Sequence, residues 1–157
     1  MTDELRVETA PANEDIQTLR ESLYAYNVAG VGGLEAEELA ILVRGEDGEL
    51  RGGLYGWIWG GYLEVNLLWV HEAERGRGLG SRLLSMAEAE GRARGAHTAV
   101  LDTHTFQAPD FYRRQGYEVY ATVEGYPAGH DKLYFRKRLL PETSPTAETT
   151  ERTNEAG

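Results

Sequence analysis

Apolar residues recur at two spacings along the chain, and these spacings divide it into helices and strands. Between residues 13 and 30 they recur every three or four positions, which predicts an amphipathic helix. A second helical stripe begins at Leu79 and runs through Met86 towards Gly95, a suitable C-terminal stop. Pro109 suits the first turn of a short third helix that ends at Gly116. The first stripe consists of Ile16, Leu19, Leu23 and Tyr26.

Seven strand-like runs lie around these three helices. The run ELRVETA precedes the first helix, and three runs between residues 38 and 70 are separated by the turn sequences EDG and GG. Such turns predict consecutive antiparallel strands. The run HTAVLDT follows the second helix, which predicts a right-handed parallel crossover, and YEVYATV and KLYFRKRL complete the set. The pattern therefore predicts a mixed α/β layer with an antiparallel first half.

The length of 157 residues fits one domain, which we expect over residues 1–140. Residues 141–157 are polar, rich in threonine and contain proline, so this segment is predicted to be a disordered tail. No run approaches the 18 apolar residues of a membrane span, and the N-terminal decapeptide lacks the features of a secretory signal. A cytoplasmic location is therefore expected.

The composition limits the kinds of reactive group, metal site and partner that the chain can have. The chain has no cysteine, which excludes disulfides, zinc–thiolate sites and cysteine nucleophiles. Its four histidines show no ligand spacing, so no metal is expected. The net charge of −10 disfavours nucleic acids and anionic membranes as partners and favours a cationic substrate, unless the charge serves solubility alone. Five arginines nevertheless fall between Arg75 and Arg94, which indicates a local anion site.

The stretch ERGRGLGSRLL, residues 74–84, combines three glycines with the start of a helix. It lacks the lysine of a Walker loop, and its G-x-G-x-G spacing does not match the dinucleotide fingerprint. Two interpretations remain: a tight turn alone, or an anion site. Glycines let a ligand approach the backbone, and the free N–H groups of a helix start attract anions. With Arg75 and Arg77 beside it, the loop is typical of a pyrophosphate cradle.

The segment RGRGLG, Arg75–Gly80, fits the Arg/Gln-x-x-Gly-x-Gly/Ala signature, and APDFYRRQGYEV fits a second motif, Ala-x-x-Phe-Tyr-x-x-x-Gly-Phe/Tyr. Through both motifs and its strand order, the chain resembles the GNAT superfamily of acetyl-CoA-dependent N-acyltransferases over roughly Leu5–Leu139. The resemblance implies a seven-stranded, mostly antiparallel sheet with helices on both faces. Its fourth and fifth strands would form a parallel pair that splays apart.

The resemblance also implies where acetyl-CoA binds. Its pantetheine arm would pair with the exposed edge of strand four like an added β-strand. That edge would be supplied by Leu68, Trp69 and Val70. The pyrophosphate would lie on the backbone of Arg75, Gly76, Arg77, Gly78, Leu79, Gly80 and Ser81.

Two catalytic candidates follow from the same resemblance. Tyr112 occupies the tyrosine of the Phe-Tyr pair, which in many members donates a proton to the leaving thiolate; the alternative is a packing aromatic. Glu64 lies 14 residues before Gly78, the spacing of the general base in the histone-acetylating branch. The alternative is a rim glutamate paired with an arginine. A bulge near residues 66–69, common in this strand of the family, would change which side chains share a face.

The acceptor side is less defined. Its candidates are Tyr24, near the loop where the family shapes its acceptor pocket, Trp57, whose aromatic stripe is otherwise core, Asn66 and the loop residue His104. The resemblance implies an N-acetyltransferase that moves the acetyl group to a primary amine by direct transfer in a ternary complex. The acceptor would be a small-molecule or protein amine, and a homodimer is common in the family. The alternative is a catalytically silent acyl-CoA-binding regulator.

Overall fold

A computed structural model describes residues 4–140, and the predicted tail at 141–157 lies outside the described residues. One long helix precedes three strands, and two helices alternate with the remaining three strands. The elements are α1 (Asn13–Gly30), β1 (Glu37–Arg44), β2 (Leu50–Trp59), β3 (Tyr62–Val70), the short 3-10 helix η1 (Glu72–Glu74), α2 (Leu79–Ala93), β4 (Thr98–His104), α3 (Pro109–Arg114), β5 (Glu118–Val123) and β6 (Lys132–Arg138).

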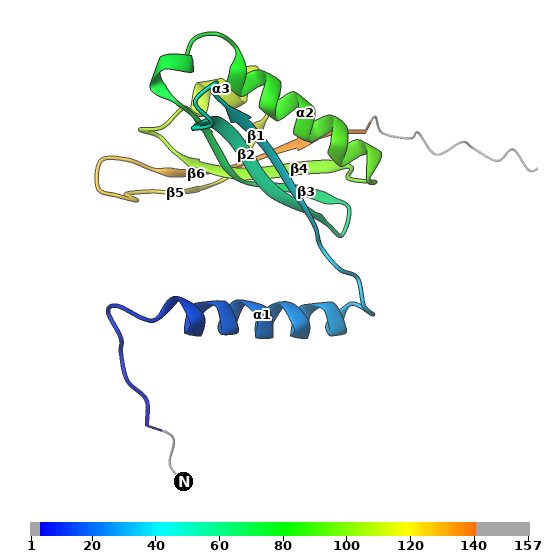
Figure 1. Ribbon diagram of the computed structural model, residues 1–157, viewed down its shortest axis with the longest axis vertical. Coiled ribbons are helices and arrows are strands. Elements are labelled where there is room, and N and C mark those ends of the chain that lie inside the picture. The colour runs from blue at the N-terminus through cyan, green and yellow to red at the C-terminus, as the bar shows by residue number, and fades with distance from the viewer. Residues whose placement is uncertain (1–3, 141–157) are drawn as a thin grey trace, which may run out of the picture.

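The six strands form a single open sheet in the order β1-β2-β3-β4-β6-β5, shown in Figure 1. Only β3 and β4 are parallel, and every other neighbouring pair is antiparallel. The turns EDG and GG join β1, β2 and β3 as predicted, and α2 provides the predicted crossover between β3 and β4. The mixed α/β fold with one central parallel pair is therefore confirmed.

The parallel pair is short, and this shapes the middle of the sheet. Tyr62–Glu64 of β3 pair with Thr98–Val100 of β4, and no further pairing of the two strands is found in the described chain. Beyond these residues both strands continue without bonding to each other, so the predicted splay is confirmed. A bulge in β3 leaves Asn66 unpaired, because Tyr55 is opposite Leu67 and Gly56 is opposite Val65. The bulge lies at the edge of the predicted region.

The hydrophobic core lies between one face of the sheet and α2. Leu54, Leu63 and Phe135 point from β2, β3 and β6 towards Leu83 and Leu84 of α2, and all five are fully buried. The short helix α3 joins the same layer, because the ring of its Tyr112 lies 5.9 Å from that of Phe135. Both α2 and α3 therefore cover the same face, and the opposite face of the sheet is left without a packed helix in the described structure.

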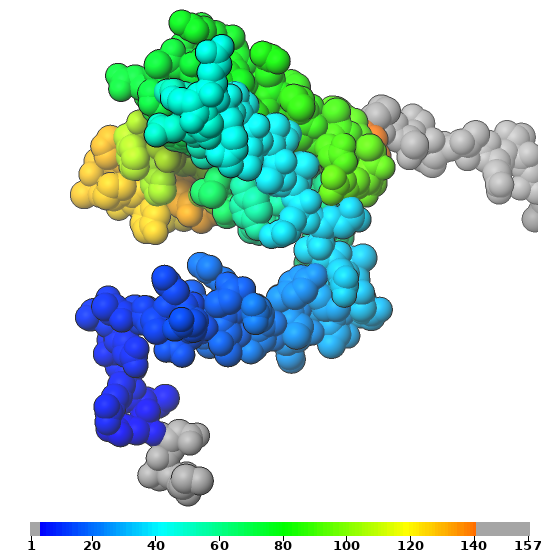
Figure 2. Space-filling model, viewed as in Figure 1, coloured from blue at the N-terminus to red at the C-terminus, as the bar shows by residue number. Residues whose placement is uncertain are grey.

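The N-terminal segment differs most from expectation. The run ELRVETA is not a strand, so the sheet has six strands rather than seven; Leu5 and Val7 are 95% and 96% exposed. Strand formation needs a partner, and nothing in the described chain pairs with this segment. Helix α1 does form at the predicted residues, yet none of the residues 13–30 is buried. It lies apart from the sheet, with open space between the two in Figures 1 and 2. None of the helices in the described range is long and apolar enough to cross a membrane.

Candidate active site

A groove of about 880 Å³ opens where β3 and β4 separate. Its walls come from the second half of β3, the loop that follows, the first turn of α2, the end of β4 and helix α3. It exists because β3 and β4 diverge after three paired residues, which leaves the edge of β3 without a neighbour. An unpaired strand edge presents backbone N–H and C=O groups that an extended ligand can use.

The glycine loop at one end of the groove has a backbone that favours glycine. Gly76 and Gly78 both have φ of +75°, in the left-handed region that other residues rarely adopt. The Nε atom of Arg75 donates a 3.1 Å hydrogen bond to the carbonyl oxygen of Val70, which ties the loop to the end of β3. This bond positions the turn, and Arg75 also lines the groove.

Free backbone donors follow directly after this loop. Gly78 is the N-cap of α2, and the N–H of Arg82 bonds to its carbonyl oxygen at 3.1 Å. The N–H groups of Leu79, Gly80 and Ser81 precede this bond, so they have no partner within the helix. All three residues line the groove. Together with the positive end of the helix dipole, they can bind an anionic group such as a phosphate.

Tyr112 enters the same groove from α3. Its ring packs between Phe111, Tyr117 and Phe135, at centroid distances of 5.0, 6.1 and 5.9 Å. Burial, and to a smaller extent the charge of Asp102, raises the pKa of the Tyr112 phenol above its ordinary value. The phenol is therefore protonated at neutral pH and can donate a proton or a hydrogen bond into the groove.

The groove collects eleven of the 16 residues predicted from the sequence. They are Asn66, Leu68, Trp69, Val70, Arg75, Gly76, Gly78, Leu79, Gly80, Ser81 and Tyr112. Their convergence agrees with the predicted cofactor site, whose occupant stays a prediction. The other five residues lie outside the groove lining of the described chain.

Glu64 and Trp57 are in register on β3 and β2, on the face of the sheet that α2 does not cover. Glu64 is exposed, so the single chain does not shield its carboxylate from solvent. Arg77 also points to solvent, and its guanidinium lies 3.7 Å from the carboxylate of Glu74.

The two remaining candidates lie further away. The hydroxyl of Tyr24 accepts a 3.0 Å hydrogen bond from the N–H of Ala36, beyond the end of α1. His104 is stacked between Phe106 and Tyr126 at ring distances of 5.1 and 5.3 Å. The structure therefore does not bring Tyr24 and His104 together with the groove residues.

Comparison with known proteins agrees with this geometry. The family model of the acetyltransferase (GNAT) family matches residues 2–117. The chain belongs to the GNAT family. Because its relatives are acetyltransferases, this GNAT protein is an N-acetyltransferase, and the resemblance seen in the sequence is confirmed.

Three similar proteins illustrate the relationship. A blasticidin-S acetyltransferase of Streptomyces morookaense is 47% identical over 94 residues, which cover 59% of this chain and 69% of that protein. An acetyltransferase of Agrobacterium fabrum is 37% identical over 123 residues, covering 78% and 90% of the two chains. The crystal structure of an acetyltransferase from Agrobacterium tumefaciens superposes with a TM-score of 0.78 at 34% identity, over 87% of this chain and 99% of that one.

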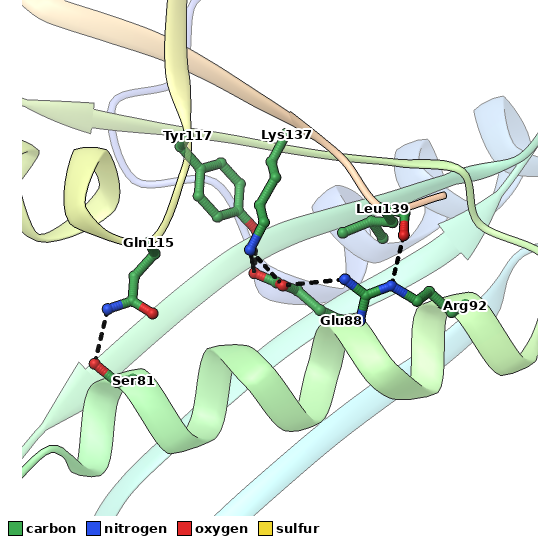
Figure 3. Close-up of polar contacts among 7 residues, drawn as sticks. All are labelled: Ser81, Glu88, Arg92, Gln115, Tyr117, Lys137 and Leu139. Carbon is green, nitrogen blue, oxygen red and sulfur yellow. Dashed lines mark hydrogen bonds and ion pairs between the residues drawn. The ribbon is translucent and has the colours of Figure 1, made fainter. Parts of the chain in front are cut away.

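Sequence reasoning missed how this GNAT protein holds α3 against α2. The side-chain amide of Gln115 donates a 2.9 Å hydrogen bond to the hydroxyl oxygen of Ser81, which joins the segment after Tyr112 to the first turn of α2 (Figure 3). The N–H of Tyr117 bonds to the carbonyl oxygen of Tyr112 at 3.0 Å. The contact between Gln115 and Ser81 thus connects the two ends of the groove, and it joins residues 34 apart in sequence, a separation that no local pattern indicates.

A buried ion pair supports the same region. Glu88 of α2 is only 4% exposed, and its carboxylate accepts hydrogen bonds of 2.7 and 3.0 Å from the ammonium of Lys137 on β6. Arg92 lies 3.8 Å from the same carboxylate, and the Tyr117 hydroxyl donates to it at 3.2 Å (Figure 3). Burial, followed by the charge of Glu88, raises the pKa of the Tyr117 phenol strongly. In the sequence, Glu88 is simply an acidic residue within a helical stripe.

The loop after β4 also contributes more than the sequence analysis assigned to it. The side-chain oxygen of Gln107 accepts hydrogen bonds from the Thr103 hydroxyl at 2.9 Å and from the His104 N–H at 2.8 Å. Asp102, Thr103, Phe106 and Gln107 all line the groove. The polar run DTHTFQ was the available signal, although it does not say which of its side chains close the loop and which face the groove.

Proposed function

We propose that this GNAT enzyme transfers the acetyl group of acetyl-CoA to a primary amine by direct transfer within a ternary complex. One observation carries the proposal: a single groove joins the free N–H groups of Leu79, Gly80 and Ser81 to the protonated phenol of Tyr112. An anion site at one end and a proton donor at the other suit a cofactor that carries a pyrophosphate and a thioester.

The cofactor would lie along the edge of β3 that β4 leaves unpaired. Its pantetheine amides would bond to the backbone of Leu68, Trp69 and Val70, and its pyrophosphate would bind the start of α2. The thioester carbonyl would then lie near the bulge at Asn66, where a backbone N–H of Leu68 or Val70 would stabilise the oxyanion. Each of the residues named here lines the groove, which supports this arrangement.

The acetyl transfer then uses the amine, the thioester and two side chains of the enzyme. The nitrogen of a neutral amine attacks the thioester carbonyl carbon and forms the C–N bond, and the C–S bond breaks as the tetrahedral intermediate collapses. The departing thiolate takes the proton of Tyr112, and the amine loses a proton to a base, for which Glu64 is our candidate. The products are the acetamide and CoA thiol, and solvent returns the proton from Glu64 to Tyr112. Direct transfer is favoured because the chain offers no cysteine for an acyl-enzyme.

The acceptor is proposed to be a small cationic amine. The chain carries a formal net charge of −10, which attracts cations to its surface. A relative is named for acetylation of blasticidin S, so this antibiotic is the first acceptor to test. Polyamines, aminoglycosides and peptide amines are the alternatives that a screen must include.

The test is CoA release from acetyl-CoA, measured with a thiol reagent across a panel of these amines. The absence of cysteine keeps the background of the reagent low. We expect saturable turnover with at least one small basic amine, and a product whose mass is raised by one acetyl group. Binding of acetyl-CoA without turnover on any amine would favour the silent regulator instead. Failure to bind acetyl-CoA would contradict the proposed function itself.

A further inference from the structure

The face of the sheet opposite α2 is uncovered and carries exposed apolar side chains, and we call it the open face. Apolar residues from four of the six strands contribute to it, because side chains alternate along each strand and the bulge in β3 turns Leu67 and Trp69 to this side. Single chains rarely expose apolar patches of this extent, and such patches mark sites of interaction. Its exposed apolar side chains are Leu42, Trp59, Tyr62, Leu67, Trp69, Tyr120 and Val123.

A second unpartnered surface lies on the same chain. Residues 4–30, which we call the N-terminal arm, comprise the extended segment and α1. Leu19, Leu23 and Tyr26 form one stripe along α1 and are 67%, 61% and 77% exposed. An amphipathic helix of this kind gains its stability in a protein by packing its apolar stripe against another element.

The arm is held away from the open face of its own chain. The Trp59 indole N–H donates a 3.0 Å hydrogen bond to the carbonyl oxygen of Leu34, which fixes the linker to the end of β2. The bond between the Tyr24 hydroxyl and the N–H of Ala36 fixes the last turns of α1 to the same linker. Figure 2 shows open space between α1 and the strands. The chain thus carries both a surface to be covered and a helix able to cover it, without joining them.

We propose that two copies of this chain exchange their N-terminal arms, so that the α1 stripe of each copy packs on the open face of the other. In a two-fold symmetric dimer the same contact forms twice, so the α1 stripe and the open face of each copy are both covered. Half-exposed aromatic and leucine side chains present roughly 100 Å² each, so the open face offers about 700 Å² and the α1 stripe about 300 Å². Two reciprocal contacts would bury about 2,000 Å² in total, which is the size of a stable dimer interface.

The exchange also completes the acceptor side of the site. Glu64 lies on the open face, in register with Trp57 on β2 and Val100 on β4, and is exposed in the single chain. The partner's arm would cover this region and provide the burial that the single chain lacks. This part of the inference rests on the proposed function, whereas the exchange itself rests only on the two apolar surfaces and is tested without any activity.

The first test measures the mass of the full chain in solution by light scattering and sedimentation. We expect 35 kDa, which is twice the chain mass of 17.5 kDa. Leu23→Arg should raise the dimer dissociation constant about 100-fold, because it places a charge in the contact. The matched control Gln17→Arg lies on the opposite side of α1 and should leave the dimer unchanged. A wild-type monomer, or a Leu23→Arg dimer of wild-type affinity, would overturn the proposal.

The second test distinguishes exchange from closure of the arm on its own chain. The natural chain has no cysteine, so single cysteines can be placed freely. Leu23→Cys is made in one tagged chain, and Leu42→Cys, Tyr62→Cys and Tyr120→Cys are made separately in a second chain. After mixing, a short bismaleimide should link Leu23→Cys to at least one of the three positions between chains. As a comparison, Leu23→Cys is also combined with each of the three positions in one chain. Links that form only within such a double-cysteine chain, or no link from Leu23→Cys to any of the three positions, would contradict the exchange.

Discussion

Helices α1 and α2 are both amphipathic, yet only α2 has its apolar stripe covered within the single chain. Helix α2 buries Leu83, Leu84 and Ala87 against the sheet, whereas α1 leaves Leu19 and Leu23 more than half exposed. An apolar stripe shows which side of a helix favours burial, and it does not show what covers that side. The comparison therefore divides the molecule into a groove region that is complete within one chain and an arm that is not.

The groove region, residues 62–117, is supported from within. Its glycine loop is tied to β3 through Arg75, its two helices are joined through Gln115 and Ser81, and its parallel strands create the groove by separating. The open face, in contrast, is uncovered in the single chain, and we propose that the arm of a second copy covers it. We therefore expect substitutions in the groove region to act on the single chain, and substitutions in the arm to act through the dimer.

The largest effect is expected from Glu88→Gln, which tests whether the groove region supports itself. It leaves the ammonium of Lys137 without its buried partner, and losing one member of such a pair costs about 3 kcal/mol of unfolding free energy. Urea unfolding should show this loss. Glu90→Gln on the same helix, whose side chain is 45% exposed, should cost less than about 0.5 kcal/mol. Equal losses of unfolding free energy in the two variants would show that the buried pair stabilises the fold no more than an exposed pair does.

The next effect concerns the chemistry of the groove. Tyr112→Phe keeps the ring packing and removes the proton donor, so kcat should fall about 100-fold while the Kd of acetyl-CoA changes little. Because the pKa of the wild-type phenol is raised, its loss of activity through deprotonation should begin only above about pH 10. Tyr126→Phe, in the turn between β5 and β6 and outside the groove lining, is the control for kcat. An unchanged kcat in Tyr112→Phe would mean that Tyr112 only packs and donates no proton.

A smaller effect should show whether the glycine loop takes part in acetyl-CoA binding or whether backbone strain there only lowers stability. Gly78→Ala places a side chain at φ of +75° beside the groove, and acetyl-CoA should bind about tenfold more weakly in calorimetric titrations. Gly95→Ala introduces the same kind of strain at φ of +87°, after the end of α2. It should lower thermal stability without weakening binding. Equal binding losses in both variants would assign the effect to stability and not to the anion site.

The smallest effect is a pH dependence. The folded chain holds the Tyr117 proton more tightly than the unfolded chain, so this residue contributes stability that is fully present below about pH 10 and is lost as the pH rises further. Tyr117→Phe removes the bond to Glu88 and should cost about 1 kcal/mol at pH 7. It should also flatten the alkaline decline of stability measured by urea unfolding between pH 8 and 11. An equally steep decline in both proteins would contradict this assignment.

The order of elements and most residues of the groove were predictable because their signals are local. The stripe after Gly78, the turn signals between β1 and β3, and the two motifs around Arg75 and Tyr112 each lie within a short window. The missing first strand was not predictable, since pairing depends on a distant partner that ELRVETA does not find in one chain. The contact between Glu88 and Lys137 joins residues 49 apart, and the exposure of Glu64 depends on what covers the open face.

One measurement tests the division of the molecule most directly: titration of acetyl-CoA into wild-type protein and into Leu23→Arg, combined with amine turnover for both. Both proteins should bind acetyl-CoA with the same Kd, since the groove belongs to one chain. The monomeric variant should nevertheless lose most of its turnover. Loss of acetyl-CoA binding in Leu23→Arg, or full turnover by a monomeric Leu23→Arg protein, would contradict this division into groove region and arm.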